Sequence, residues 1–179
     1  VPPGGASYVM EIPPVGPGGV RQTVNVGLND DQTLWHFRSG WNVAALNCLD
    51  TEHEAILNGY SAFLRNSSRK LAATNTALDA EFRRQHSTRS NAIKARETYM
   101  TQVYNYFALP PARGDFCNVV LGISNEYLAS TPADINQFAA AGLPRIDAVF
   151  DRFFSAYEQY RVDSAAWDAR YGAQYGASQ

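Results

Sequence analysis

The sequence predicts one mainly α-helical domain, a bundle of four or five helices preceded by a small N-terminal β-hairpin or extended arm. The chain has 179 residues, which suits a single domain with its own core. Hydrophobic residues make up 45% and charged residues 18%, so the chain should fold rather than stay disordered. Near Asn29 the hydrophobic pattern changes from a strand-like to a helix-like period. We expect the arm over residues 1–30, the helical body over 31–171 and a frayed tail over 172–179.

The arm combines prolines and glycines with two short segments rich in β-branched residues. Residues 7–12 and 20–26 roughly alternate between apolar and polar side chains, and residues 13–19 between them have the composition of a turn. This pattern predicts an antiparallel hairpin, with an extended arm as the alternative. A lone hairpin would be marginally stable, so either form must pack on the helices.

The first helix is predicted to begin at Asn29. Asn29 followed by Gln32 is a capping-box pattern, in which each side chain accepts a backbone N–H of the other residue. Apolar residues then lie on nearly every face, which is typical of a central, buried helix. Its main apolar stripe comprises Leu34, Phe37, Trp41, Ala45 and Cys48.

Helical periodicity continues through the rest of the chain. A second helix is predicted from about Thr51 to Gln85, either unbroken or interrupted at residues 66–68. A third is predicted over residues 90–108, where Pro110 and Pro111 end it.

The last third of the chain predicts two further helical segments. One begins at Asp115. The other has a start signal at residues 131–134, where a threonine is followed by proline and aspartate. The stripe that follows keeps its phase across Gly142, Leu143 and Pro144, so we expect a kink there or two helices meeting end to end.

The chain has two cysteines, Cys48 and Cys117, and we predict that they form a disulfide. Two separate buried thiols are the alternative. The bridge would join the end of the first helix to the start of the fourth. A disulfide suits an oxidising compartment, and the start Val1-Pro2-Pro3 resembles what remains after removal of a signal peptide, although a trimmed chain would begin in the same way. We therefore expect a periplasmic or secreted protein.

Composition also argues against two classes of partner. The formal net charge is −2 with acids and bases interspersed, whereas nucleic-acid-binding domains usually carry a basic stripe. No apolar run approaches about 18 residues, so we expect no transmembrane segment.

Two segments, residues 41–48 (WNVAALNC) and residues 103–110 (VYNYFALP), resemble parts of uncharacterised exported proteins from alphaproteobacteria. The resemblance extends over about residues 20–170. It implies a bacterial origin and export, and it brings no activity and no site residues.

The metal-binding patterns in the sequence are incomplete. His53-Glu54 begins like the zinc-protease motif, but Leu57 stands where the second histidine is needed. Asp50 and His53 match half of a di-metal carboxylate motif, which requires a second such pair and two more acids. We therefore predict no metal site and no cofactor.

Catalytic signatures are incomplete as well, and we predict no catalytic residues. Ser67 and Lys70 have the spacing found in penicillin-binding enzymes, but the other motifs of that class are absent from the sequence. Asp147 and Asp151 lie one helical turn apart beside arginines, which is typical of a solvated, charge-balanced helix face.

Aromatic residues interleaved with amides are the remaining candidates for a ligand pocket. Trp35 and Trp41 are six positions apart on one helix and therefore project in directions about 120° apart. We predict that Trp41 lies in the core and that Trp35 borders a surface or cleft near the arm. The candidate ligand-binding residues are Trp35, His36, Arg38, Trp41, Asn42, Tyr104 and Asn105.

Three functional hypotheses follow. The first is a non-enzymatic exported helical protein that binds an unknown protein partner or self-associates in the bacterial envelope. The second is a binding protein for a small ligand or glycan fragment. The third is a hydrolase with a scattered site around His36, His53 or Glu54.

Overall fold

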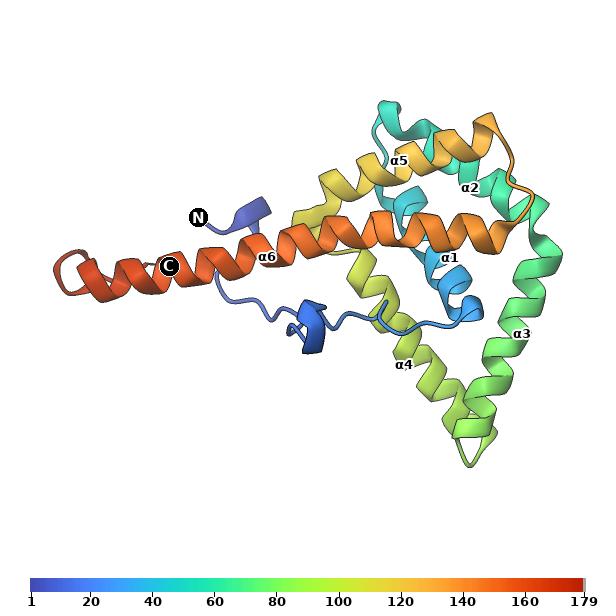
Figure 1. The fold of residues 1–179 in the computed structure, drawn as a ribbon, viewed down its shortest axis with the longest axis horizontal. Helices are drawn as coiled ribbons and strands as arrows, with labels where there is room; N and C mark the ends of the chain where they lie inside the picture. The colour runs from blue at the N-terminus through green and yellow to red at the C-terminus, as the bar shows by residue number, and fades with distance from the viewer. Residues whose placement is uncertain (179) are drawn as a thin grey trace.

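The computed structural model describes residues 1–178, and within them the fold is helical (Figure 1). The mainly α class is confirmed, although the described residues form six α-helices rather than four or five. The α-helices are α1 (Asp30–Asn47), α2 (Glu54–Asn66), α3 (Ser68–Gln85), α4 (Arg89–Phe107), α5 (Arg113–Ala129) and α6 (Ile135–Tyr175). Short 3-10 helices are η1 (Pro3–Gly5), η2 (Pro17–Gly19), η3 (Thr51–His53) and η4 (Pro110–Ala112).

Helix α1 is the centre of the bundle, as its apolar pattern predicts. The capping box is present: Asn29 Oδ1 accepts from the backbone of Gln32, and the Gln32 side chain accepts from the backbone of Asn29. Helix α1 packs against each of the other five α-helices. Phe37 and Trp41 are fully buried there, and the indole of Trp41 stacks on Phe63 of α2 with 5.0 Å between ring centroids. Placing Trp41 in the core is therefore confirmed.

The predicted N-terminal hairpin is wrong. Within residues 1–178 the arm contains one isolated antiparallel bridge, between Val15 and Arg21, and no strand. The arm lies along α6, whose side chains satisfy its polar groups in place of a partner strand (Figure 1). Tyr157 Oη donates to the carbonyl of Ser7 at 2.8 Å, and the buried Arg21 guanidinium reaches Glu158 at 3.0 Å.

The second predicted helix is interrupted at residues 66–68, the alternative to an unbroken helix from Thr51 to Gln85. Helix α2 ends at Asn66 and α3 begins at Ser68, with Ser67 between them. The break redirects the chain, so that α3 and α4 pair as a helical hairpin at one side of the bundle (Figure 1). Thr88 caps α4 by accepting from the backbone of Asn91. This hairpin and α1 enclose the cavity described below.

Helix α6 is one continuous helix, not two helices meeting end to end. It begins one turn later than the start signal indicates, because Asp134 rather than Thr131 caps it by accepting from the backbone of Gln137. Gly142 lies against α1: a Cβ there would stand 2.6 Å from Cε2 of Phe37. This close approach explains a glycine in the middle of a long helix.

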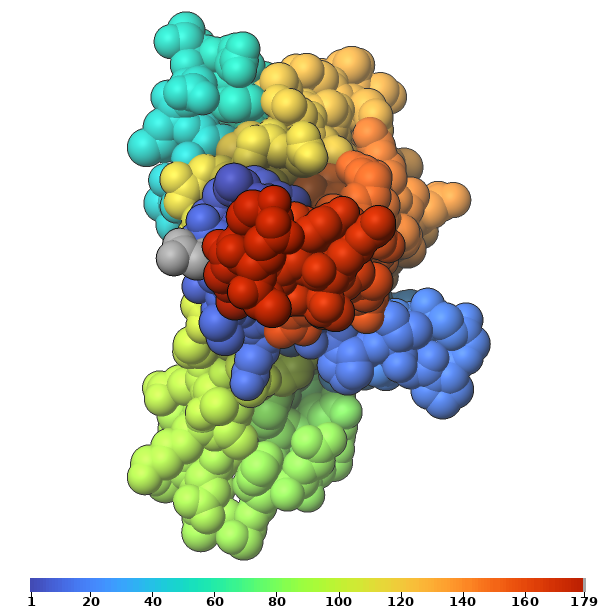
Figure 2. Space-filling view, turned by 90° about the vertical axis from the view of Figure 1, so that its left-hand side faces the viewer, coloured from blue at the N-terminus to red at the C-terminus, as the bar shows by residue number. Residues whose placement is uncertain are grey.

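The C-terminal part of α6 projects away from the bundle (Figures 1 and 2). The helix continues to Tyr175, so the predicted frayed tail from residue 172 is too long. After Gly176 the chain turns back, and the backbone of Ser178 donates to Asp168 at 2.5 Å. Gln179, the last residue of that predicted tail, lies outside the described residues.

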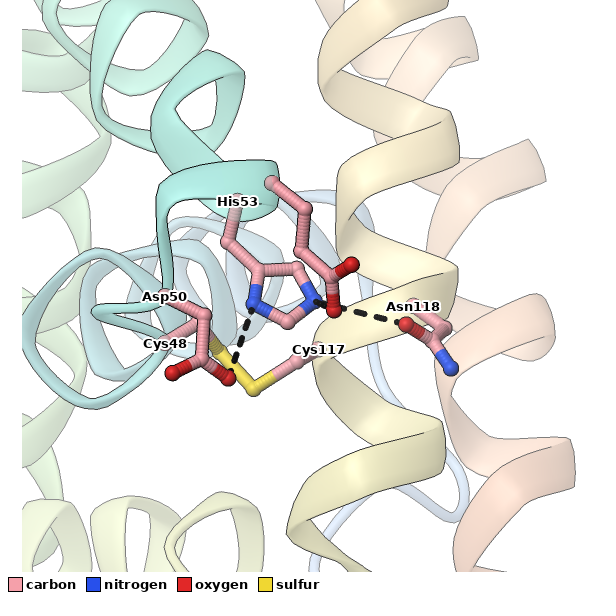
Figure 3. A network of polar contacts seen from close by, with 6 residues as sticks. Cys48, Asp50, His53, Cys117 and Asn118 are labelled. Carbon is pink, nitrogen blue, oxygen red and sulfur yellow. Dashed lines mark hydrogen bonds and ion pairs between the residues drawn. A yellow bond between two sulfur atoms is a disulfide. The ribbon is translucent and has the colours of Figure 1, made fainter.

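The predicted disulfide is confirmed. Cys48 directly follows α1 and Cys117 lies in the first turns of α5, with 5.7 Å between their Cα atoms. The bond joins the end of α1 to α5, at residues 69 positions apart in the sequence (Figure 3). Among residues 1–178 no helix is both long enough and apolar enough to span a membrane.

Candidate functional site

The structure brings three of the predicted ligand-binding residues together and separates the others. Trp35 and His36 line one cavity, and the Arg38 guanidinium lies over the Trp35 ring at 4.7 Å. Trp41 is buried in the core, where its Nε1 donates to Ser124 Oγ at 2.9 Å. Asn42, Tyr104 and Asn105 also lie outside this cavity. Asn42 and Tyr104 are half-buried, and Asn105 is exposed and lines a different hollow beside the arm.

The cavity has a volume of about 160 Å³ and lies between α1, α3 and α4. Each helix contributes residues three or four positions apart, which places them on one face of that helix. The lining residues are Gln32, Trp35 and His36 of α1, Leu78, Glu81, Phe82 and Gln85 of α3, and Arg96, Tyr99 and Met100 of α4.

Two guanidinium groups lie close to the Trp35 ring. Arg38 lies 4.7 Å and Arg96 5.6 Å from its ring centroid, distances at which cation–π attraction operates. Arg96 also forms an ion pair with Asp79 and donates to Asn75 Oδ1 at 2.6 Å, both on α3. These contacts fix the indole as one wall of the cavity and connect α4 to α3.

The buried His36 is the central member of a hydrogen-bonded chain. Its Nδ1 lies 2.7 Å from Asn25 Oδ1 of the arm, and the oxygen can only accept, so Nδ1 carries the proton. Nε2 of the neutral ring then accepts from Tyr99 Oη, at 2.5 Å. Asn25 Nδ2 donates to Asp147 Oδ1 of α6 at 2.6 Å, and Tyr106 Oη donates to the same oxygen at 2.9 Å. The chain therefore links α1, the arm, α4 and α6. Each group donates its proton in the direction of Asp147, which accepts the last hydrogen bonds.

Burial determines the protonation states along this chain. Desolvation lowers the pKa of His36 to about 4, so the ring is neutral at pH 7. Desolvation raises the pKa of Asp147 to about 6, against the hydrogen bonds from Asn25 and Tyr106, so the carboxyl is ionised at pH 7. Burial and the nearby Glu81 raise the pKa of Tyr99 to about 12. These states agree with the donor directions above.

This arrangement favours binding over base catalysis. Both ring nitrogens of His36 are hydrogen-bonded, Nδ1 to Asn25 and Nε2 to Tyr99. The imidazole could therefore accept a proton from a substrate only if the hydrogen bond from Tyr99 were broken first. His53 and Glu54, the other residues of the hydrolase hypothesis, do not line this cavity.

Sequence reasoning missed Asn25, Tyr99 and Asp147. The prediction that Asp147 lies on a solvated face is wrong, because its carboxylate is largely buried between α4 and the arm, whereas Asp151 is exposed. The sequence did contain a sign that Asp147 is buried. Its helix face also carries Leu143, four residues earlier, and Phe150 and Phe154, three and seven residues later. No comparable pattern marks Asn25, which lies in irregular structure.

Comparison with known proteins gives no identification. No family model matches the chain, and neither curated proteins nor solved structures give a significant match.

Proposed function

We propose that this protein binds a small planar molecule in the cavity between α1, α3 and α4. The observation that carries the proposal is the lining, in which Trp35, Phe82 and Tyr99 supply aromatic surface beside a few polar groups. Ligand sites commonly combine these elements.

The volume of the cavity limits the ligand to about one ring. A cavity of about 150 Å³ in another protein holds one benzene molecule, and this cavity is similar at about 160 Å³. The polar groups include a carboxylate, Glu81, and a guanidinium, Arg96, which Asp79 already neutralises. Since both signs of charge border the cavity, a neutral aromatic or heteroaromatic ring with a hydrogen-bonding edge suits it better than an ion.

Filling the cavity should abolish binding. Met100 lines the cavity, so Met100→Trp is expected to occupy it, whereas Thr101→Trp on the exposed side of α4 leaves it open. The measurement is ligand-observed NMR with phenol, indole, imidazole and benzamide at millimolar concentration. We expect at least one compound to bind the wild type and the Thr101→Trp control, and to bind Met100→Trp at least tenfold more weakly. Equal binding to all three proteins, or no binding to the wild type, would contradict the proposal.

The site of action we propose is an oxidising compartment, the periplasm or the exterior of the cell. The support is the bond between Cys48 and Cys117, since disulfides persist in such compartments and are rare in the cytosol.

Self-association through α6 is the second function we propose. Trp167, Tyr171 and Tyr175 follow one another at four-residue spacing on the projecting part of the helix, and adjacent rings are in contact. Trp167 is 39% and Tyr175 68% exposed. Residues 161–175 carry two arginines and two aspartates, so two copies of the segment would not repel each other. A second copy of this chain is therefore the partner that fits this face.

A charge placed in this stripe should prevent the association. We expect sedimentation velocity to show a concentration-dependent dimer for the wild type and for Val162→Arg, which lies on the opposite face of α6. Trp167→Arg should remain monomeric. A wild-type protein that is monomeric throughout the accessible concentration range would exclude self-association.

A further inference from the structure

A second polar cluster lies beside the disulfide (Figure 3), and none of its residues lines the cavity. Asp50, Glu52 and His53 occupy the link between α1 and α2, which includes η3. One ligand atom from each of the three residues lies within 4.8 Å of the other two. Asp50 and Glu52 are exposed, whereas His53 is only 6% exposed.

The hydrogen bonding of His53 leaves one buried nitrogen without a partner. Nε2 lies 3.3 Å from Asn118 Oδ1, an acceptor, so Nε2 carries the proton of the neutral ring. Nδ1 then presents a lone pair, is buried and has no hydrogen-bond partner. Asp50 Oδ2 lies 3.8 Å from Nδ1, and Glu52 Oε1 lies 3.8 Å from Nε2, and both distances are too long for a hydrogen bond.

Two electron-pair donors, an imidazole nitrogen and a carboxylate oxygen, thus face each other across a gap. They repel unless a positive charge lies between them. We propose that this is a divalent transition-metal site of the Zn²⁺ class, with His53 Nδ1 and Asp50 as ligands. The exposed Glu52, whose Oε1 lies 3.8 Å from Nε2 of the same ring, would turn toward the ion as the third ligand.

The distances suit such an ion. Zn²⁺ binds nitrogen and oxygen ligands at about 2.0–2.2 Å, which places two tetrahedral ligands about 3.4 Å apart. The observed separation of 3.8 Å between Nδ1 and Asp50 Oδ2 closes with a small movement of the exposed aspartate. Three protein ligands leave the fourth position open to water or an external ligand.

The surroundings of His53 resemble the support of known metal sites. A metal-binding histidine usually donates its other N–H to an oxygen acceptor, which fixes the ring, and Asn118 has this role here. The disulfide holds the two halves together, because Cys48 is two residues before Asp50 and Cys117 directly precedes Asn118 (Figure 3). The sequence pattern alone pairs Asp50 with His53 and does not point to Glu52 or Asn118.

The test measures Zn²⁺ affinity of the full chain by competition with a fluorescent chelator. We expect Asp50→Asn to weaken Zn²⁺ binding at least tenfold and Asn118→Ala to weaken it by about tenfold, the lower end of the range for such supporting residues. Glu54→Gln is the matched control, because Glu54 is an exposed acid next to the cluster and outside it, and its affinity should equal that of the wild type.

A second readout identifies the ligand atom. In a long-range ¹H–¹⁵N spectrum, Zn²⁺ should shift the Nδ1 resonance of His53 and leave its Nε2 protonated. Unchanged affinity in Asp50→Asn, or Zn²⁺ binding that leaves the His53 resonances in place, would overturn the proposal. This outcome is independent of the ligand cavity, since the two sites share no residue.

Discussion

Replacing both cysteines, Cys48→Ser together with Cys117→Ser, is expected to lower the free energy of unfolding by about 4 kcal/mol. The two residues are 69 positions apart, so the bond closes a long loop and restricts the unfolded chain strongly. For a domain of ordinary stability, about 5–15 kcal/mol, this loss is a large fraction of the total. Urea denaturation of the oxidised wild type and of the double variant measures the difference.

Reduced wild-type protein is the control for this experiment. Treatment with a thiol reductant removes the same bond without changing any residue, so its unfolding free energy should approach that of the double variant. A difference below about 1 kcal/mol between oxidised and reduced protein would show that the disulfide contributes little.

The second large effect is the dependence of stability on pH. Folding lowers the pKa of His36 and raises the pKa of Asp147, so the two groups change the unfolding free energy in opposite directions. The pKa of His36 is lowered from 6.5 to about 4, so the unfolded chain binds more protons and stability falls as the pH drops from about 6.5 to 4. The pKa of Asp147 is raised from 3.8 to about 6, so the folded protein binds more protons and stability falls as the pH rises from about 4 to 6. Each contribution amounts to about 3 kcal/mol, and in the wild type the two largely cancel.

Single substitutions should expose each contribution. In Asp147→Asn the contribution of His36 remains, so we expect the unfolding free energy to rise by about 3 kcal/mol between pH 4 and pH 6.5. In His36→Gln the contribution of Asp147 remains, and the unfolding free energy should fall by a similar amount over this range. Urea denaturation at a series of pH values measures both slopes. Equal slopes in the two variants would refute this account of the buried chain.

The helical class and several helix ends follow from local sequence. The Asn29 and Gln32 side chains close a capping box with neighbouring backbone, and such contacts within one turn need no other part of the chain. The apolar pattern on all faces of α1 predicts its central position, because every face must then be covered. The disulfide was predictable too, since the chain has only two cysteines.

Long-range contacts decided what the sequence did not predict. The arm has the alternation of a hairpin, but Tyr157 and Arg21 satisfy polar groups between the arm and α6, so no strand pairing is needed. Pro144 looks like a helix break, yet α6 continues through it as it packs along α1 and α5.

The candidate sites depend on tertiary structure even more. In the sequence Asp147 looks like a surface acid. In the fold Asn25 and Tyr106, from two other segments, donate hydrogen bonds to its carboxylate and cover it. The cavity takes a few residues from each of three helices, and a spacing of three or four residues along one helix marks a face but not what that face meets. The sequence by itself therefore determined the helices, their main apolar faces and the disulfide. Only the folded chain decided which polar side chains lose contact with water, because that depends on residues distant in sequence.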